Sequence, residues 1–265
     1  MPTNALPLSI ELPDYREYKM MLRPNLFDEK KSSMQSFQKG LERNLKSHKA
    51  SLSGTEFQRS KRQRIEVLDT KDFQIRNLGL LLRKRTRVTA ASRKAIEMTL
   101  KCRSPDLCIA IGHHCPIPQN FSTKSKLEED VATPFVSRFS RSTTVTLSSA
   151  PRTTEEITAI FSCLRSIEGL PKYLKRVNDL QITEDVFEGP VFKFGEVSAK
   201  VAVILWFIPK RKKPVAAEFS FRVPFNDVMD HPDTAKQILG FYETMQGTKW
   251  MSSEFGTKSS FIYES

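Results

Sequence analysis

The chain has 265 residues, of which 39% are hydrophobic and 27% are charged, and its formal net charge is +12. This size and balance are typical of a globular protein with a sizeable core. The longest apolar run, Val201–Ile208, is too short to cross a bilayer, so no membrane role is expected. The positive charge favours an anionic partner, although a basic surface that is merely solvated would have the same composition.

The first half of the chain alternates between strand and helix patterns. Alternation predicts an opening strand over Tyr15–Leu22, with Tyr15, Glu17, Lys19 and Met21 on one face. The spacing of Met34, Phe37, Leu41 and Leu45 predicts a helix over Asp28–Lys49, which ends before a break at Ser51–Gly54. Next we expect a strand over Lys61–Asp69, a helical turn over Lys71–Leu78, and a hairpin of Leu80–Val88 with Lys94–Cys102 across Thr89–Arg93.

The second half begins with a less regular stretch, Arg103–Ser125, which three prolines interrupt. Beyond it we expect short strands over Leu127–Asp130 and Thr143–Leu147, a helix from Thr153 or Thr154 to about Ile167, strands over Tyr173–Asn178, Gln181–Phe187, Val197–Ile208 and Val215–Val223, and a final helix over Thr234–Gly247. Antiparallel strands with helices outside them indicate the α+β class. We expect a single domain over residues 1–265, in which 103–150 could be an elaboration.

Basic side chains gather on one face of the predicted hairpin. Arg83, Arg85 and Arg87 point the same way in the first strand, and Lys101 shares a face with Glu97 and Thr99 in the second. These cations repel one another unless an anion lies between them, and guanidinium groups match phosphate oxygens. The pattern predicts a polyphosphate-binding sheet. The alternative is a solvated face whose counter-charges are Glu97 and Glu66.

The four cysteines, Cys102, Cys108, Cys115 and Cys163, show no paired framework, and with His113 and His114 their spacing fits no compact zinc site. Residues Met1–Leu12 lack the pattern of a signal peptide. We therefore expect a cytoplasmic protein. The run Lys210–Lys213 is interpreted as a solvated turn between two strands rather than as a nuclear-import or nucleic-acid tract.

Five short motifs occur in order along the chain. They are Glu17-x-Lys19, Asp69-Thr70 followed by Gly79, Leu82-Arg83-Lys84-Arg85, Thr99-Leu100-Lys101, and Glu218-Phe219-Ser220. From about Glu17 to Lys258 this set resembles the CYTH superfamily, also called the triphosphate tunnel metalloenzymes. Two departures stand out, because Tyr15 and Ser220 occupy positions where that family carries a second acid.

The resemblance implies a closed, antiparallel, eight-stranded β-barrel with charged side chains inside and helices packed outside. It also implies a triphosphate or polyphosphate ligand and a divalent cation, Mg²⁺ or Mn²⁺. Transferred to this sequence, the metal ligands are Glu17 and Glu218. The catalytic residues are Glu17, Lys19, Arg83, Arg85 and Lys101, and the phosphate contacts are Lys19, Arg83, Arg85, Arg87, Lys101, Lys200 and Lys258.

Three functions remain open from the sequence. The first, which we favour, is metal-dependent hydrolysis of a triphosphate or polyphosphate compound. The second is a non-catalytic protein that binds polyphosphate, a phosphorylated metabolite or an RNA end, because the missing acids weaken the metal site. The third is general nucleic-acid binding. Neither the substrate nor the oligomeric state follows from the sequence.

Overall fold

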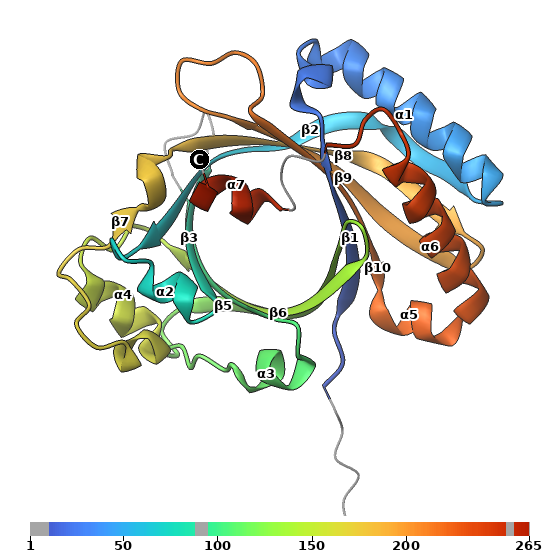
Figure 1. Ribbon diagram of the computed structural model, residues 1–265. Coiled ribbons are helices and arrows are strands. Elements are labelled where there is room, and N and C mark those ends of the chain that lie inside the picture. Colours follow the sequence, from blue (N-terminus) through green and yellow to red (C-terminus); the bar gives the residue numbers. More distant parts are fainter. Residues whose placement is uncertain (1–10, 88–94, 253–256, 265) are drawn as a thin grey trace, which may run out of the picture.

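The computed structural model describes residues 11–87, 95–252 and 257–264, and its central feature is a sheet that curves into a ring (Figure 1). Within these residues the strands are β1 (Tyr15–Leu22), β2 (Ser51–Asp69), β3 (Leu80–Arg87), β4 (Ile96–Ser104), β5 (Ser122–Ala132), β6 (Val136–Leu147), β7 (Lys175–Arg176), β8 (Ile182–Phe194), β9 (Val197–Phe207) and β10 (Ala216–Pro224). Their order is β3-β4-β6-β5-β1-β10-β9-β8-β2-β7, and a further pairing of β3 with β2 makes the ring continuous.

The ring differs from the predicted all-antiparallel, eight-stranded barrel. Following the pairings from β3 round to β2 passes through nine strands, and the two-residue β7 adds to the edge of β2. One pair is parallel: β1 lies beside β5, with Glu17 opposite Asp130. Short connections produce antiparallel neighbours, whereas a parallel pair requires a long crossover. The chain makes that crossover between β1 and β5, so local patterns could not reveal the pairing.

Helices cover the outer face of the ring on two sides (Figure 1). On one side lie α1 (Lys30–Ser47), α5 (Phe225–Asp230) and α6 (Pro232–Gln246), and on the other α2 (Gln74–Asn77), α3 (Leu107–Gly112) and α4 (Thr154–Ile160). The first group packs Phe37 and Phe241 against strand residues such as Phe192 and Phe219. The second group buries Leu82, Met98 and Leu100 against Ile157 and Phe161. Both cores take apolar residues from the outer face of the strands, so the polar alternate residues are directed inward.

A seventh helix, α7 (Lys258–Glu264), lies inside the ring in Figure 1 and was not predicted. Its Ile262 is buried with Ile65, Val67 and Trp206 in a cluster that lines the inner wall. The hydroxyl of Tyr263 donates a hydrogen bond to Asp69 Oδ2 over 3.2 Å. The helix has only seven residues, so its apolar pattern was too brief to detect.

The Asp69-Thr70 motif has a structural role at the end of β2. The carboxylate of Asp69, which is 1% exposed, accepts hydrogen bonds from the backbone N–H groups of Thr70, Ile75 and Arg76 at 2.7, 3.0 and 3.1 Å. The N–H groups of Ile75 and Arg76 are unsatisfied donors in the first turn of α2. Gly79 follows with φ of +72°, a conformation that a glycine adopts without strain, and leads the chain into β3. The motif therefore fixes the turn that precedes β3 and so positions the arginines of that strand.

Several element boundaries differ from the prediction. β2 begins at Ser51, although a break was expected at Ser51–Gly54 and a strand only from Lys61. Its first half is mostly polar and exposed, and Leu52 and Phe57 are too far apart to form an alternating pattern, so nothing marked it as a strand. β5, β6 and β8 are also longer than expected. Pairing with neighbouring strands extends β5 and β6 through mostly polar residues, and it continues β8 past Gly189 and Pro190 to Phe194.

Two predicted elements are shorter in the structure. The strand expected over Tyr173–Asn178 is reduced to β7 and a 3₁₀ turn, Val177–Asp179, in which Asn178 has positive φ. The helix expected to reach Ile167 ends at Ile160, and a second 3₁₀ segment, Ser162–Ser166, follows. Another 3₁₀ segment, Pro24–Phe27, precedes α1. The predicted turn at Thr89–Arg93 lies outside the described residues. Lys210–Lys213 lie exposed between β9 and β10, and residues 103–150 contain β5 and β6 of the ring.

The prediction that the cysteines are unpaired is wrong. Cys115 and Cys163 form a disulfide across a sequence separation of 48, with Cα atoms 5.2 Å apart. Cys102 is buried and free, and Cys108 is exposed and free. The bond joins two irregular segments that only the fold brings together, so no spacing rule could predict it. The cytoplasmic location stays a prediction. Among the helices of the described ranges, none is long and apolar enough to cross a membrane.

Candidate functional site

The interior of the ring is polar, charged and hollow. A cavity of about 670 Å³ lies toward α7 and a second of about 440 Å³ adjoins it. The two share six lining residues, so they form one continuous space; these are Glu17, Arg85, Lys126, Thr144, Ile204 and Arg222. Cavities of this size accommodate a small ligand. The interior of the ring is therefore a candidate site, and the predicted basic residues Arg83, Arg85 and Lys101 line its larger cavity.

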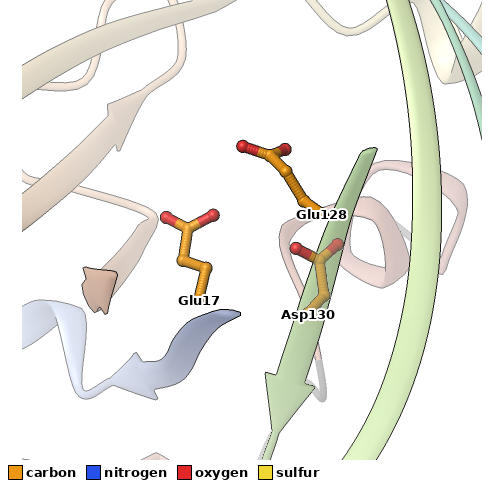
Figure 2. A group of neighbouring side chains, drawn as sticks. All are labelled: Glu17, Glu128 and Asp130. Atoms are coloured by element: carbon orange, nitrogen blue, oxygen red, sulfur yellow. The ribbon is translucent and has the colours of Figure 1, made fainter. Parts of the chain in front are cut away.

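Three carboxylates from two neighbouring strands converge in the larger cavity. Glu17 of β1 and Glu128 and Asp130 of β5 each offer an oxygen atom, and these atoms lie within 4.8 Å of one another. Figure 2 shows the three side chains directed into the same space. The parallel register places Glu17 opposite Asp130 and Tyr15 opposite Glu128. An acid thus stands beside Tyr15, where the sequence suggested that an acid had been lost.

Three cations surround Asp130. Lys19 Nζ lies 2.7 Å from Asp130 Oδ1, and Lys101 Nζ and Arg103 Nη2 lie 3.0 and 3.3 Å from Oδ2. Although burial favours the neutral acid, Lys101, Lys19 and Arg103 hold the pKa of Asp130 far below its ordinary value. Asp130 is therefore an anion at physiological pH, and its low pKa makes it a weak base, so it is better suited to holding cations than to accepting a proton.

Lys19 also bridges two members of the acidic group. Its ammonium nitrogen lies 2.9 Å from Glu17 Oε2. Burial disfavours the ammonium charge, but Asp130 and Glu17 outweigh it and hold the pKa of Lys19 above its ordinary value. Burial likewise favours the neutral form of Glu17, yet Lys19 holds the pKa of Glu17 below its ordinary value. The group is thus a network of permanent charges.

The basic side chains that line the larger cavity are only partly hydrogen-bonded. The Nε atoms of Arg83, Arg85 and Arg103 are buried, and none has a hydrogen-bond acceptor among the described residues. Burial and the neighbouring Arg85 lower the pKa of Arg83 to about 9. Burial, with Lys19 and Arg103, lowers the pKa of Lys101 to about 8 although Asp130 opposes the change. An unpaired buried donor is costly, so this wall favours an anion that accepts its hydrogen bonds.

The predicted metal ligand Glu218 lies in a different set of contacts. Its Oε1 is 2.9 Å from Nζ of Lys258, the first residue of α7, and the same nitrogen is 3.8 Å from Glu184 Oε2. Glu184 also accepts hydrogen bonds from Gln63 Nε2 at 2.6 Å and Trp206 Nε1 at 2.7 Å. Glu17 is thus grouped with Glu128 and Asp130 rather than with Glu218. Lys258, which the sequence analysis proposed as a phosphate contact, lines the larger cavity.

The remaining predicted contacts, Arg87 and Lys200, line the smaller cavity. Arg87 is exposed at the end of β3 and pairs with Glu97 over 3.2 Å. Lys200 is exposed on β9. Both lie inside the ring but are not among the residues that line the cavity with the three acids.

The sequence analysis missed Glu128, Asp130 and Arg103. A usable pattern was present, since Glu128-x-Asp130 is an acidic pair at strand spacing and Arg103 continues the face of Lys101. The segments around these residues were interpreted as a short strand and an irregular stretch. Recognising the acids as part of the site required the β1–β5 pairing.

No protein-family model matches the chain, and no curated protein matches it. Among solved structures it is similar to a putative adenylate cyclase from Bacillus halodurans, with 13% identity, 95% of this chain and 98% of the other covered, and a TM-score of 0.43. A putative adenylyl cyclase from Hippeastrum, described as having a dominant triphosphatase activity, gives 12% identity, coverage of 92% and 93%, and a TM-score of 0.44. A protein from Pyrococcus horikoshii OT3 has 10% identity, with 91% of this chain and 94% of the other covered, and a TM-score of 0.38.

The identities and TM-scores are low, so the likeness carries no argument about the activity of this chain. The resemblance to the triphosphate tunnel proteins stands on the ordered motifs and on the ring with its charged interior.

Proposed function

We propose that the ring interior binds the triphosphate group of a small molecule and, with a divalent cation, hydrolyses a terminal phosphoanhydride bond. The observation that carries the proposal is the wall of three buried Nε–H groups, those of Arg83, Arg85 and Arg103, which have no acceptor among the described residues. Planar guanidinium groups at close spacing fit the oxygens of successive phosphates. A triphosphate would satisfy these donors and relieve the repulsion that lowers the pKa of Arg83.

The donor set fits a hard divalent cation. Glu17, Glu128 and Asp130 offer three carboxylate oxygens in one place, and Mg²⁺ and Mn²⁺ prefer oxygen ligands. These three residues would hold the ion, with Glu218 left on Lys258. When bound, such an ion supplies charge neutralisation and polarises a phosphoryl oxygen.

The protein's own cations have separable tasks in this proposal. Arg83, Arg85 and Lys101 bind and orient the phosphate oxygens, and they stabilise the negative charge of the transition state. Lys19 keeps Glu17 and Asp130 ionised, because its ammonium lies within 2.9 Å of the first and 2.7 Å of the second. The ring of strands limits the access of bulk water, which strengthens each of these interactions.

A thermal melting series tests the proposal. A ligand that binds only the native state raises stability by about 2.7 kcal/mol when its concentration is 100 times Kd. We expect tripolyphosphate to raise Tm, Mg²⁺ or Mn²⁺ to increase that shift, and phosphate to be released under the same conditions. If tripolyphosphate changes neither Tm nor any direct binding measurement, the proposal is wrong.

One observation favours the second candidate, a binder without turnover. Lys19 already bridges Glu17 and Asp130, so part of the acidic charge is neutralised without a metal ion. This candidate predicts a shift in Tm with tripolyphosphate that is independent of Mg²⁺ and Mn²⁺, and no release of phosphate. The two candidates therefore differ in metal dependence as well as in activity.

A further inference from the structure

The smaller cavity has a character of its own. It is lined by residues of β2, β3, β5, β8, β9 and β10 among others, and no described residue of α7 contributes to it. Its space continues into the larger cavity past Glu17 and Arg85. We call this smaller cavity the mouth. A linear ligand held by the arginines of the larger cavity would extend into it.

Three lysines of the mouth are exposed and come from three strands. They are Lys61 of β2, Lys124 of β5 and Lys200 of β9. Their ammonium groups make no ion pair or hydrogen bond with another described residue. Three other mouth cations are already engaged: Arg87 pairs with Glu97, Lys126 pairs with Glu128, and the Arg222 guanidinium lies over the Tyr15 ring. The remaining one, Arg85, belongs to the arginine wall of the larger cavity. The three lysines thus give the mouth a surplus of positive charge. Glu188 is an exposed acid in the same lining and offsets only part of that surplus.

The lining also indicates what kind of anion fits. Among the described residues, no aromatic side chain lines the mouth; its apolar members are Val186, Val201, Ala202 and Ile204. Single-stranded nucleic acid is held by stacking of bases on aromatic faces as well as by charge. A phosphate chain without bases requires charge alone. The mouth therefore suits inorganic polyphosphate better than the 5′ end of an RNA.

We propose that the mouth binds phosphate units beyond the third, so that linear polyphosphates longer than tripolyphosphate are the preferred ligands. This inference rests on the proposed function, because the terminal phosphates would occupy the arginine wall. Lys61, Lys124 and Lys200 each contribute a long-range attraction and a salt-dependent contact.

Calorimetric binding of tripolyphosphate and of linear hexaphosphate tests the inference. The mouth variant carries Lys61→Gln, Lys124→Gln and Lys200→Gln. Its matched control carries Lys31→Gln, Lys39→Gln and Lys46→Gln, three exposed lysines of α1 on the outside of the ring, so both variants lose the same charge. We expect the mouth variant to lose about tenfold in affinity for hexaphosphate and less than threefold for tripolyphosphate. The control should keep both affinities within about twofold.

Each other outcome has a definite meaning. If tripolyphosphate binds but hexaphosphate binds no more tightly in the wild type, or if both triple variants lose affinity equally, the inference is wrong and the proposed function stands. If neither phosphate binds, the proposed function fails as well. A 5′-triphosphorylated oligonucleotide that binds as tightly as hexaphosphate, and loses affinity in the mouth variant, would overturn the choice of an inorganic chain.

Discussion

Glu128 lies directly opposite Tyr15 in the parallel pairing of β1 with β5. The sequence places a tyrosine where a triphosphate tunnel protein carries the first glutamate of its opening strand, and the neighbouring strand supplies a carboxylate at the same level. The Glu128 oxygen lies within 4.8 Å of those of Glu17 and Asp130. The acidic group therefore contains three members although β1 contributes only one.

This relationship predicts a compensation between the two positions. Glu128→Gln should abolish most of the metal-dependent part of the Tm shift with tripolyphosphate, because it removes one of three charged oxygen ligands. Adding Tyr15→Glu to Glu128→Gln should restore part of it, since the new carboxylate lies on the adjacent strand. The measurement is the melting shift with and without Mn²⁺ for wild type and both variants.

Glu129→Gln is the control for that pair. Glu129 is also on β5 but faces outward, where it lies 2.6 Å from Arg16 Nε. This variant should lower stability without changing the metal dependence. Equal losses of metal dependence in Glu128→Gln and Glu129→Gln would show that the acidic group does not bind the ion.

The arginine wall predicts a separation of stability from binding. Arg83→Met should reduce the affinity for tripolyphosphate by at least about tenfold, because a charge-assisted hydrogen bond contributes about 1.5–3 kcal/mol. It should leave stability unchanged or raise it by about 1 kcal/mol, since an apolar side chain removes the buried Nε–H that has no acceptor among the described residues. Calorimetric binding and chemical denaturation measure the two effects.

Lys84→Met is the matched control on the same strand. Lys84 points outward and pairs with Glu66. It should leave the affinity for tripolyphosphate within about twofold of the wild type. A loss of affinity as large as that of Arg83→Met would contradict a specific role of the inward face.

Lys101 predicts a pH dependence of both stability and binding. Its pKa is lowered from 10.5 to about 8 in the folded protein, so between pH 8 and 10.5 the unfolded chain binds more protons. The contribution of Lys101 to stability should therefore rise with pH across that window. Its contribution to phosphate binding should fall as pH rises through about 8, because the ammonium charge of the free protein is lost.

Lys101→Arg separates this effect from the titration of the ligand itself. An arginine stays charged across the window, so the variant should not show the decline in affinity that comes from deprotonation of Lys101. Any change in affinity that remains then comes from titration of the ligand. The affinities of both proteins for tripolyphosphate are compared from pH 7 to about 9.5. Parallel curves for wild type and variant would show that Lys101 does not titrate there.

The disulfide predicts a dependence on redox conditions. Cys115–Cys163 closes a loop across 48 positions of sequence. Its reduction should lower the free energy of unfolding by about 2–4 kcal/mol. Melting curves with and without reductant measure the change, and the double variant Cys115→Ser with Cys163→Ser should melt at the lower temperature and ignore the reductant. No response of the wild type to reductant would contradict a formed bond in solution.

The sequence by itself determined the inward basic face and the outward apolar one. Alternation along β3 and β4 places Arg83, Arg85 and Lys101 on one side and Leu82, Met98 and Leu100 on the other, and the structure has both sets as expected. A strand's period of two residues is a local property, and burial of the apolar side against helices leaves the charged side inward. The same reasoning placed Glu17 and Lys19 together on β1.

Tertiary structure alone decided which acids lie together and which segments pack inside the ring. The pairing of Tyr15 with Glu128, the contact of Lys258 with Glu218, and the bond between Cys115 and Cys163 each join segments distant in sequence. The packing of Ile262 inside the ring belongs to the same class. Such contacts depend on strand order and register, which are set by the total burial of the fold, and no window of the sequence contains both partners.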